Sequence, residues 1–140
     1  SVLRKSIIYI NFIPFNLDNL SYCSPGSIVL PKKIFSYDKN RFLNFREMNK
    51  LNFSIHNKID PYKENKLKVI NNTPDEILNA VIEMENKFKD YSSFYSKNKN
   101  FQKNFWDAFE NKEQDKVKFL ENKLKILISS SFLEQNQELL

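Results

Sequence analysis

Residues 67–77, LKVINNTPDEI, constrain the fold of this chain more than any other segment, because they predict a strand, a turn and a capped helix in succession. The β-branched pair Val69 and Ile70 suits a half-buried strand, and the two asparagines that follow suit a turn. Thr73 fits the N-cap of a helix that opens with a proline, and Glu76 fits the returning half of a capping box. A strand that leads straight into a helix is typical of α/β layering, so the segment predicts a Rossmann-like parallel sheet rather than a helical bundle.

Two apolar runs nearer the amino-terminal end predict further strands of that sheet. Residues 7–12 are almost continuously apolar, as in a parallel strand covered on both faces, and the shorter run 28–30 ends at Pro31. A strand so close to a terminus needs a neighbour on each side. After it, residues 32–40 suit an extended or turning connection, and Asn44 suits the N-cap of a short helix.

Helical spacing of apolar side chains begins in the middle of the chain. The helix that starts at Pro74 extends to about Lys89, with Glu83 and Lys87 paired on its solvated side. The polar stretch 51–66, which contains an Asp-Pro pair, predicts a loop with a helical turn.

The carboxyl-terminal third predicts amphipathic helices whose apolar pattern reaches Leu127 or Ile128. The sequence SFLE at residues 131–134 then predicts a capping box for a short terminal helix. We therefore expect a Rossmann-like α/β segment over residues 1–90 and a helical tail over residues 91–140 that packs on it.

Composition limits the chemistry that this chain can perform. The 140 residues contain one Gly, one Cys and one His, which excludes a Cys/His zinc site, a Walker loop and a G-x-S-x-G nucleophile elbow. The net charge is +5 with a pI of about 9.2, but the lysines are scattered among glutamates as on a solvated surface. Nucleic-acid binding would need those lysines on one face, so we do not expect it. No apolar run reaches the length of a transmembrane helix.

The best candidate binding residues follow the predicted strands. Ligands of open parallel α/β sheets bind beyond the carboxyl ends of the strands, where lysine can neutralise a phosphate and asparagine can bond a sugar hydroxyl or a base edge. This rule selects Asn11, Pro14, Phe15, Asn16, Lys32 and Lys33. Arg41 is added because a planar guanidinium suits a diphosphate. The alternative is that the two lysines are ordinary surface charges, and the sequence favours this alternative. For Arg46 it favours an ion pair with Glu47 or Asp38 over contact with a diphosphate.

Two further features have a chemical and a structural interpretation. His56, in a polar loop, is either a solvated side chain or a base for an acceptor hydroxyl, and the first interpretation is favoured. The aromatic residues of the tail are either a stacking platform or core, and their helical spacing favours core. They are Phe101, Phe105, Trp106 and Phe109.

Five segments, taken in order, carry a resemblance to a protein family. They are SIVLPKKIF (27–35), RFLNFREM (41–48), NTPDEI (72–77), FQKNFW (101–106) and SFLEQNQELL (131–140). Together they resemble the closing part of a family of bacterial glycosyltransferases linked to surface-polysaccharide assembly. That resemblance covers almost the whole chain, whereas the amino-terminal half of such an enzyme has no counterpart here.

The resemblance implies a fold of two Rossmann-like domains facing a cleft, the GT-B arrangement, of which this chain is the carboxyl-terminal part. It implies transfer of a sugar from a nucleotide-sugar donor, used as substrate without a further cofactor or metal, to a polysaccharide or lipopolysaccharide acceptor. The expected partners are the donor, the glycan acceptor and the missing amino-terminal domain, in the cytoplasm at the inner face of the membrane. The fragment alone is expected to be inactive. A non-catalytic Rossmann-like binding or scaffold module is the alternative.

Overall fold

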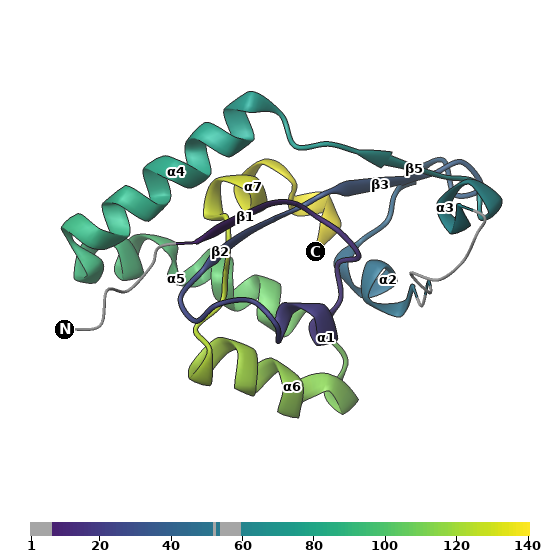
Figure 1. The fold of residues 1–140 in the computed structure, drawn as a ribbon. Helices are drawn as coiled ribbons and strands as arrows, with labels where there is room; N and C mark the ends of the chain where they lie inside the picture. The colour runs from purple at the N-terminus through teal and green to yellow at the C-terminus, as the bar shows by residue number, and fades with distance from the viewer. Residues whose placement is uncertain (1–6, 52, 54–59) are drawn as a thin grey trace.

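The strand, turn and capped helix predicted at residues 67–77 are present in the computed structural model, which describes residues 7–51, 53 and 60–140 (Figure 1). Strand β5 (Leu67–Ile70) leads into helix α4 (Pro74–Lys89). The Thr73 hydroxyl accepts a hydrogen bond from the Glu76 backbone N–H at 3.1 Å, and the Glu76 carboxylate accepts one from the Thr73 N–H at 2.8 Å. The capping box is therefore confirmed.

A parallel sheet of three strands lies at the centre of the fold. Its order is β1 (Ile8–Phe12), β2 (Ile28–Pro31) and β6 (Leu127–Ile128), with β2 in the middle and buried along its length. Ile28 is opposite Ile8 on one side and Leu127 on the other. The chain is thus an α/β protein with the partial Rossmann-like parallel sheet that the sequence predicted.

The second sheet is antiparallel and was not predicted. Its order is β4 (Arg41–Phe42), β3 (Lys33–Ser36) and β5, with Ile34 opposite Val69. Placing β5 in the parallel layer was therefore wrong. The reason is that the chain runs from β2 through Lys32 directly into β3, and the backbone of β3 pairs with β5 along one edge. The extended or turning connection expected over residues 32–40 is extended and then turns, but its extended part is the strand β3, and residues 37–40 form the turn.

The remaining helices mostly connect these strands. They are α1 (Leu17–Leu20), α2 (Phe45–Lys50), α3 (Pro61–Glu64), α5 (Tyr91–Asp107), α6 (Gln114–Lys118) and α7 (Ser130–Gln135), with 3₁₀ turns η1 (Asn111–Glu113) and η3 (Gln137–Leu139) and a π-helical turn η2 (Phe119–Lys123). Asn44 caps α2 as predicted. Figure 1 shows α4 and α7 above the parallel sheet and α1 and α6 below it.

Two expectations for the tail were wrong. Leu127 and Ile128 form strand β6 rather than a helix, because the backbone turns at Lys125, whose φ is 53°, and the chain then pairs with β2. The terminal helix is capped by Ser129, whose hydroxyl accepts from the Phe132 N–H at 3.3 Å, and not by Ser131. The tail therefore contributes a strand to the sheet as well as helices that pack on it.

Aromatic side chains fill the core beneath the sheet. The ring of Phe105 has no exposed surface and lies 5.9 Å, centroid to centroid, from Phe15 and 5.0 Å from Phe45. Trp106 and Phe109 are also buried, so the expectation that the tail aromatics form core is confirmed. Cys23 is buried as well, which raises the pKa of its thiol to about 11.

The α2 cap predicts a pH-dependent stability. The Arg41 guanidinium donates to the Glu47 carboxylate at 2.7 Å, and with Lys39 and the Asn44 N–H it lowers the pKa of Glu47 to about 2 from an ordinary 4.5. Because the folded-state pKa is depressed, this stabilisation is present above pH 4.5 and is lost as the pH falls toward 2. We expect Glu47→Gln to lower the free energy of unfolding by about 1 kcal/mol at pH 7, measured by urea denaturation.

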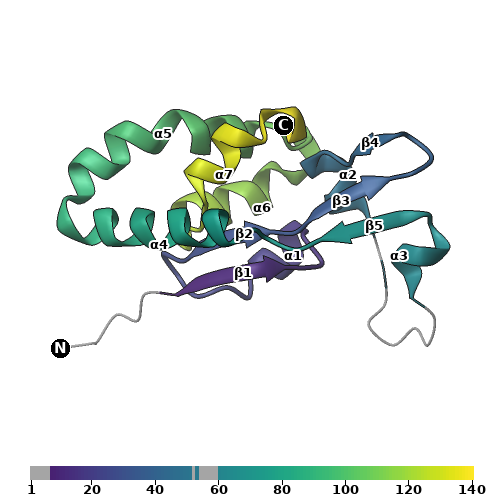
Figure 2. The same cartoon turned by 90° about the horizontal axis from the view of Figure 1, so that it is seen from above.

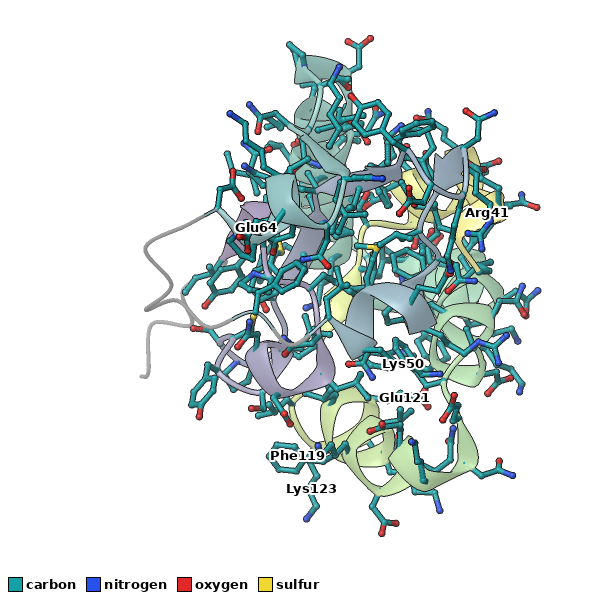
Figure 3. All side chains as sticks on the ribbon, turned by 90° about the vertical axis from the view of Figure 1, so that its right-hand side faces the viewer. Arg41, Lys50, Glu64, Phe119, Glu121 and Lys123 are labelled. Atoms are coloured by element: carbon teal, nitrogen blue, oxygen red, sulfur yellow. The ribbon has the colours of Figure 1, made fainter. Side chains whose placement is uncertain are left out.

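The same substitution should cost little near pH 2. Glu64→Gln on the exposed α3 helix, labelled with Arg41 in Figure 3, is the matched control and should show no such difference between the two pH values. A cost for Glu47→Gln that is equal at both pH values would contradict the assignment.

Candidate functional site

A cleft of about 420 Å³ opens between α4, α5 and the start of α7. Its volume falls in the range of small-molecule binding sites. The lining combines carboxylates, amides, hydroxyls, two lysines and two phenyl rings: Glu83, Asn86, Lys89, Asp90, Ser93, Phe94, Lys97, Asn98, Phe101, Ser130, Ser131 and Glu134. This polar lining over aromatic surface suits a hydroxyl-rich ligand.

Glu83 holds α4 against the segment that follows β6. Its carboxylate accepts a hydrogen bond from the Ser131 backbone N–H at 2.6 Å. Burial raises the pKa of Glu83, while hydrogen bonds from Ser131, Ser129 and Ser130 act in the opposite direction. The sequence-based prediction placed Glu83 on the solvated side of α4, and that placement was wrong.

Lys87 shows why the i,i+4 spacing gave the wrong environment for Glu83. The Glu83 and Lys87 pair matches a solvated i,i+4 ion pair. In the structure both side chains are partly buried, and the Lys87 ammonium donates to the Gly26 carbonyl at 2.6 Å. Gly26 itself has a φ of +75°, which favours glycine at this turn. Only the positions of α7 and of the Gly26 turn, which are tertiary information, identify the environment of these side chains.

Gln102 fixes α5 to the outer edge of the sheet and so sets one wall of the cleft. Its amide nitrogen donates to the Ile128 carbonyl at 2.6 Å and to the Ser130 hydroxyl at 3.1 Å, and its amide oxygen accepts from the Ile128 N–H at 3.2 Å. The side chain is 9% exposed. The amide thus takes the place of a neighbouring strand beside β6.

Asp90 forms the corner between the two long helices. It ends α4 and caps α5, where its carboxylate accepts from the Ser93 N–H at 3.1 Å. Lys89, in the last turn of α4, bonds Glu85 at 2.9 Å, and both side chains are largely exposed. Lys97 lies two turns into α5 on the same wall. Cations are therefore present in the lining of the cleft together with amides and hydroxyls.

Four of the predicted donor-binding residues hold the end of β1 and the loop after it in place. Asn11 and Asn72 bond each other reciprocally, the Asn11 N–H to the Asn72 side chain at 2.5 Å and the Asn72 N–H to the Asn11 side chain at 2.7 Å. The Pro14 carbonyl accepts from the Asn19 amide at 2.9 Å, and Asn16 caps α1. Phe15 is 2% exposed and belongs to the aromatic core.

The other three predicted residues lie near the second sheet. The Lys32 N–H donates to the Phe12 carbonyl, and the Lys33 ammonium lies 4.9 Å from the centroid of the Phe42 ring. Arg41 bonds Glu47. The structure brings Asn11 close to the Pro31–Lys32 peptide through Asn72, whose amide donates to the Pro31 carbonyl at 2.9 Å. None of the seven lines the cleft, and their role in donor binding stays a prediction.

His56 lies outside the described residues, so both interpretations of this side chain stay predictions. Glu47, one of the two partners proposed for Arg46, bonds Arg41 and Lys39, and Asp38, the other, lies 3.6 Å from the Lys66 ammonium.

Among the described residues, 7–51, 53 and 60–140, no three or more Asp, Glu, His or Cys side chains are grouped so that they could hold a metal ion. No helix in that part of the chain has the length and apolar character needed to cross a membrane. Comparison of the chain with protein-family models, curated proteins and solved structures found no match.

Proposed function

We propose that this chain is the donor-binding, carboxyl-terminal part of a glycosyltransferase, and that the cleft between α4, α5 and α7 holds a nucleotide sugar. The observation that carries the proposal is the position and lining of the cleft. It lies directly after β6 of a parallel sheet and presents amides, carboxylates and hydroxyls beside two lysines. Asparagine, serine and carboxylate groups bond sugar hydroxyls, and lysine pairs with phosphate.

In this proposal, different residues of the cleft bind different parts of the donor. Lys89 and Lys97 neutralise the diphosphate. Asn86 and Asn98 bond sugar or ribose hydroxyls, and the part of the Phe94 ring that lines the cleft contacts an apolar face of the ligand.

The proposed reaction is displacement at the anomeric carbon. The acceptor hydroxyl oxygen forms a bond to that carbon, the bond to the diphosphate oxygen breaks with its electron pair, and a base takes the hydroxyl proton. The lysines stabilise the negative charge that develops on the departing nucleotide diphosphate. The acceptor, a surface polysaccharide or lipopolysaccharide, and the base belong to an amino-terminal domain in this proposal, which also places the enzyme in the cytoplasm at the inner face of the membrane.

The alternative is a non-catalytic module that docks a partner through the aromatic residues of the tail. The positions of those side chains do not support it. Phe105, Trp106 and Phe109 are at most 5% exposed. Docking through them would require the core to open.

Calorimetric titration with UDP, GDP, ADP and CMP tests the proposal. We expect one of these nucleotides to bind, and Lys97→Glu to weaken its binding at least about tenfold, because the substitution places a negative charge beside a phosphate. Lys123→Glu makes the same change of charge on η2, at the opposite end of the molecule from α4 in Figure 3, and should leave the affinity unchanged. Absence of binding by all four nucleotides, or equal effects of the two variants, would exclude this site.

A further inference from the structure

The outward backbone groups at the two edges of the parallel sheet differ in their hydrogen bonding. At the β6 edge, the outward N–H and carbonyl of Ile128 are bonded by the Gln102 amide. At the β1 edge, the Ile28 N–H donates to the Ile7 carbonyl, and alternate backbone groups of a parallel strand face the same neighbour. The N–H and carbonyl groups of Ile8 and Ile10 therefore face away from β2. Within the described part of the chain, these groups have no hydrogen-bond partner on another strand or side chain.

An apolar stripe of α4 continues this open edge. The flank of α4 that carries Glu83 and Asn86 faces the cleft, α5 and α7. The opposite flank faces the rim formed by β1, as the view from above shows (Figure 2). Val81, 48% exposed, and Phe88, 60% exposed, lie on this flank, and Leu78, 56% exposed, lies where the flank meets the outer face of the helix.

Ile10 belongs to the same surface. The Tyr9 hydroxyl accepts from the Ser24 N–H at 3.0 Å, in the loop after α1, and α1 lies on the side of the sheet away from α4 (Figure 1). Because side chains alternate along a strand, Ile8 and Ile10 point to the α4 side. Ile10 is 46% exposed, so it extends the apolar stripe onto the strand.

Edge strands of natural proteins are usually protected by charges, prolines or bulges. Residues 8–10 contain none of the charged or proline residues, and the bulge of β1 comes after Tyr9, with Asn11 at a φ of 53°. The unprotected part of the strand is therefore short, apolar and next to the apolar flank of α4. Such an edge is a template for another strand.

We propose that a second copy of this chain occupies this surface, through antiparallel pairing of the two β1 strands about a two-fold axis at Tyr9. Ile8 of one copy then exchanges backbone hydrogen bonds with Ile10 of the other, and the two α4 helices lie side by side on the same face of a continuous sheet. The contact is isologous, so each copy supplies the same strand and the same stripe.

The available area fits a dimer. The four exposed apolar side chains, Ile10, Leu78, Val81 and Phe88, offer on the order of 400 Å² per copy, and the paired backbones and polar rim supply the remainder of the about 800 Å² per partner that a standard interface buries. The proposal concerns the sheet edge alone and does not depend on what the cleft binds.

Sedimentation velocity of the 140-residue chain over a range of concentrations tests the proposal. We expect a monomer–dimer equilibrium in the micromolar range, and Val81→Glu should raise the dimer dissociation constant at least about tenfold, because it buries a charge between the two helices. Phe119→Glu is the control. Phe119 is 47% exposed on η2, at the end of the molecule away from α4 (Figure 3), and the variant should dimerise as the unmodified chain does.

Amide hydrogen exchange separates this contact from other kinds of association. The amides of Ile8 and Ile10 should be protected in the dimer and should exchange rapidly in monomeric Val81→Glu, whose circular dichroism should be unchanged. A chain that stays monomeric, a dimer in which these two amides exchange rapidly, or an equal effect of Phe119→Glu would overturn the proposal.

Discussion

Replacement of Phe105 by alanine is expected to lower the free energy of unfolding by about 3–5 kcal/mol, the largest effect of any substitution considered for this chain. The ring has no exposed surface and contacts the rings of Phe15, Phe45, Trp106 and Phe109 at centroid distances of 4.8–5.9 Å. Its removal takes away the transfer free energy of the side chain and leaves a cavity. The neighbours around it, in the loop after β1, on α2, and on α5 and the turn after it, are fixed and cannot fill the cavity. A domain of this size is stable by only about 5–15 kcal/mol, so the variant should be close to unfolding.

Urea denaturation followed by tryptophan fluorescence measures this effect, because Trp106 is the only Trp in the chain and its ring lies 4.8 Å from that of Phe105. Phe119→Ala removes the same atoms at a site that is 47% exposed and should cost less than about 1 kcal/mol. A similar cost for the two variants would show that Phe105 is not at the centre of the core.

Replacement of Gln102 by leucine should destabilise the protein by about 2–4 kcal/mol, although leucine has a similar volume and a higher helix propensity. The substitution leaves the N–H and carbonyl of Ile128 without the partner that satisfies them at the sheet edge. An unsatisfied buried backbone group costs about 1–3 kcal/mol, and two are created here.

Asn104→Leu is the matched control, because Asn104 is exposed on the same helix. That variant should be as stable as the unmodified chain. Gln102→Glu gives a further distinction: it keeps an acceptor for the Ile128 N–H and loses the donor to the Ile128 carbonyl, so it should also be destabilised at neutral pH. If Gln102→Leu unfolds at the same urea concentration as Asn104→Leu, the Gln102 amide does not stabilise the backbone groups of the β6 edge.

Local signals predicted the parts of the fold that local physics determines. The capping boxes at Thr73 and Asn44 depend on side chains three residues apart, so both helix starts could be predicted without tertiary information. The apolar runs that became β1 and β2 were recognisable because parallel strands are buried on both faces.

Pairing between distant residues was not predictable in the same way. Val69 and Ile70 suit a strand in either kind of sheet, and only the continuation of β2 into β3 assigns β5 to the antiparallel one. Strand β6 has two residues, too few for periodicity to distinguish it from the end of a helix, and it exists because its backbone bonds β2 and Gln102.

The residues of the candidate site also depend on contacts between distant parts of the chain, so local signals did not identify them. The rule that ligands bind after parallel strands selected residues after β1 and β2, whereas the cleft is next to the segment after β6, which was expected to be helical. Glu83 had the spacing of a surface ion pair, and its contact with Ser131 joins residues 48 positions apart. Charge and amide content alone could not identify these residues.

The most direct test of the proposed donor site is a ¹H–¹⁵N NMR titration of the 140-residue chain with the nucleotide that binds most tightly in calorimetry. We predict that the largest shifts fall on the cleft, at Asn86, Asn98, Ser130 and Ser131, and that Lys97→Glu makes them much smaller at the same nucleotide concentration. Shifts confined to Lys32, Lys33 and Arg41 would move the donor to the second sheet, and an unchanged spectrum would contradict nucleotide binding by this chain.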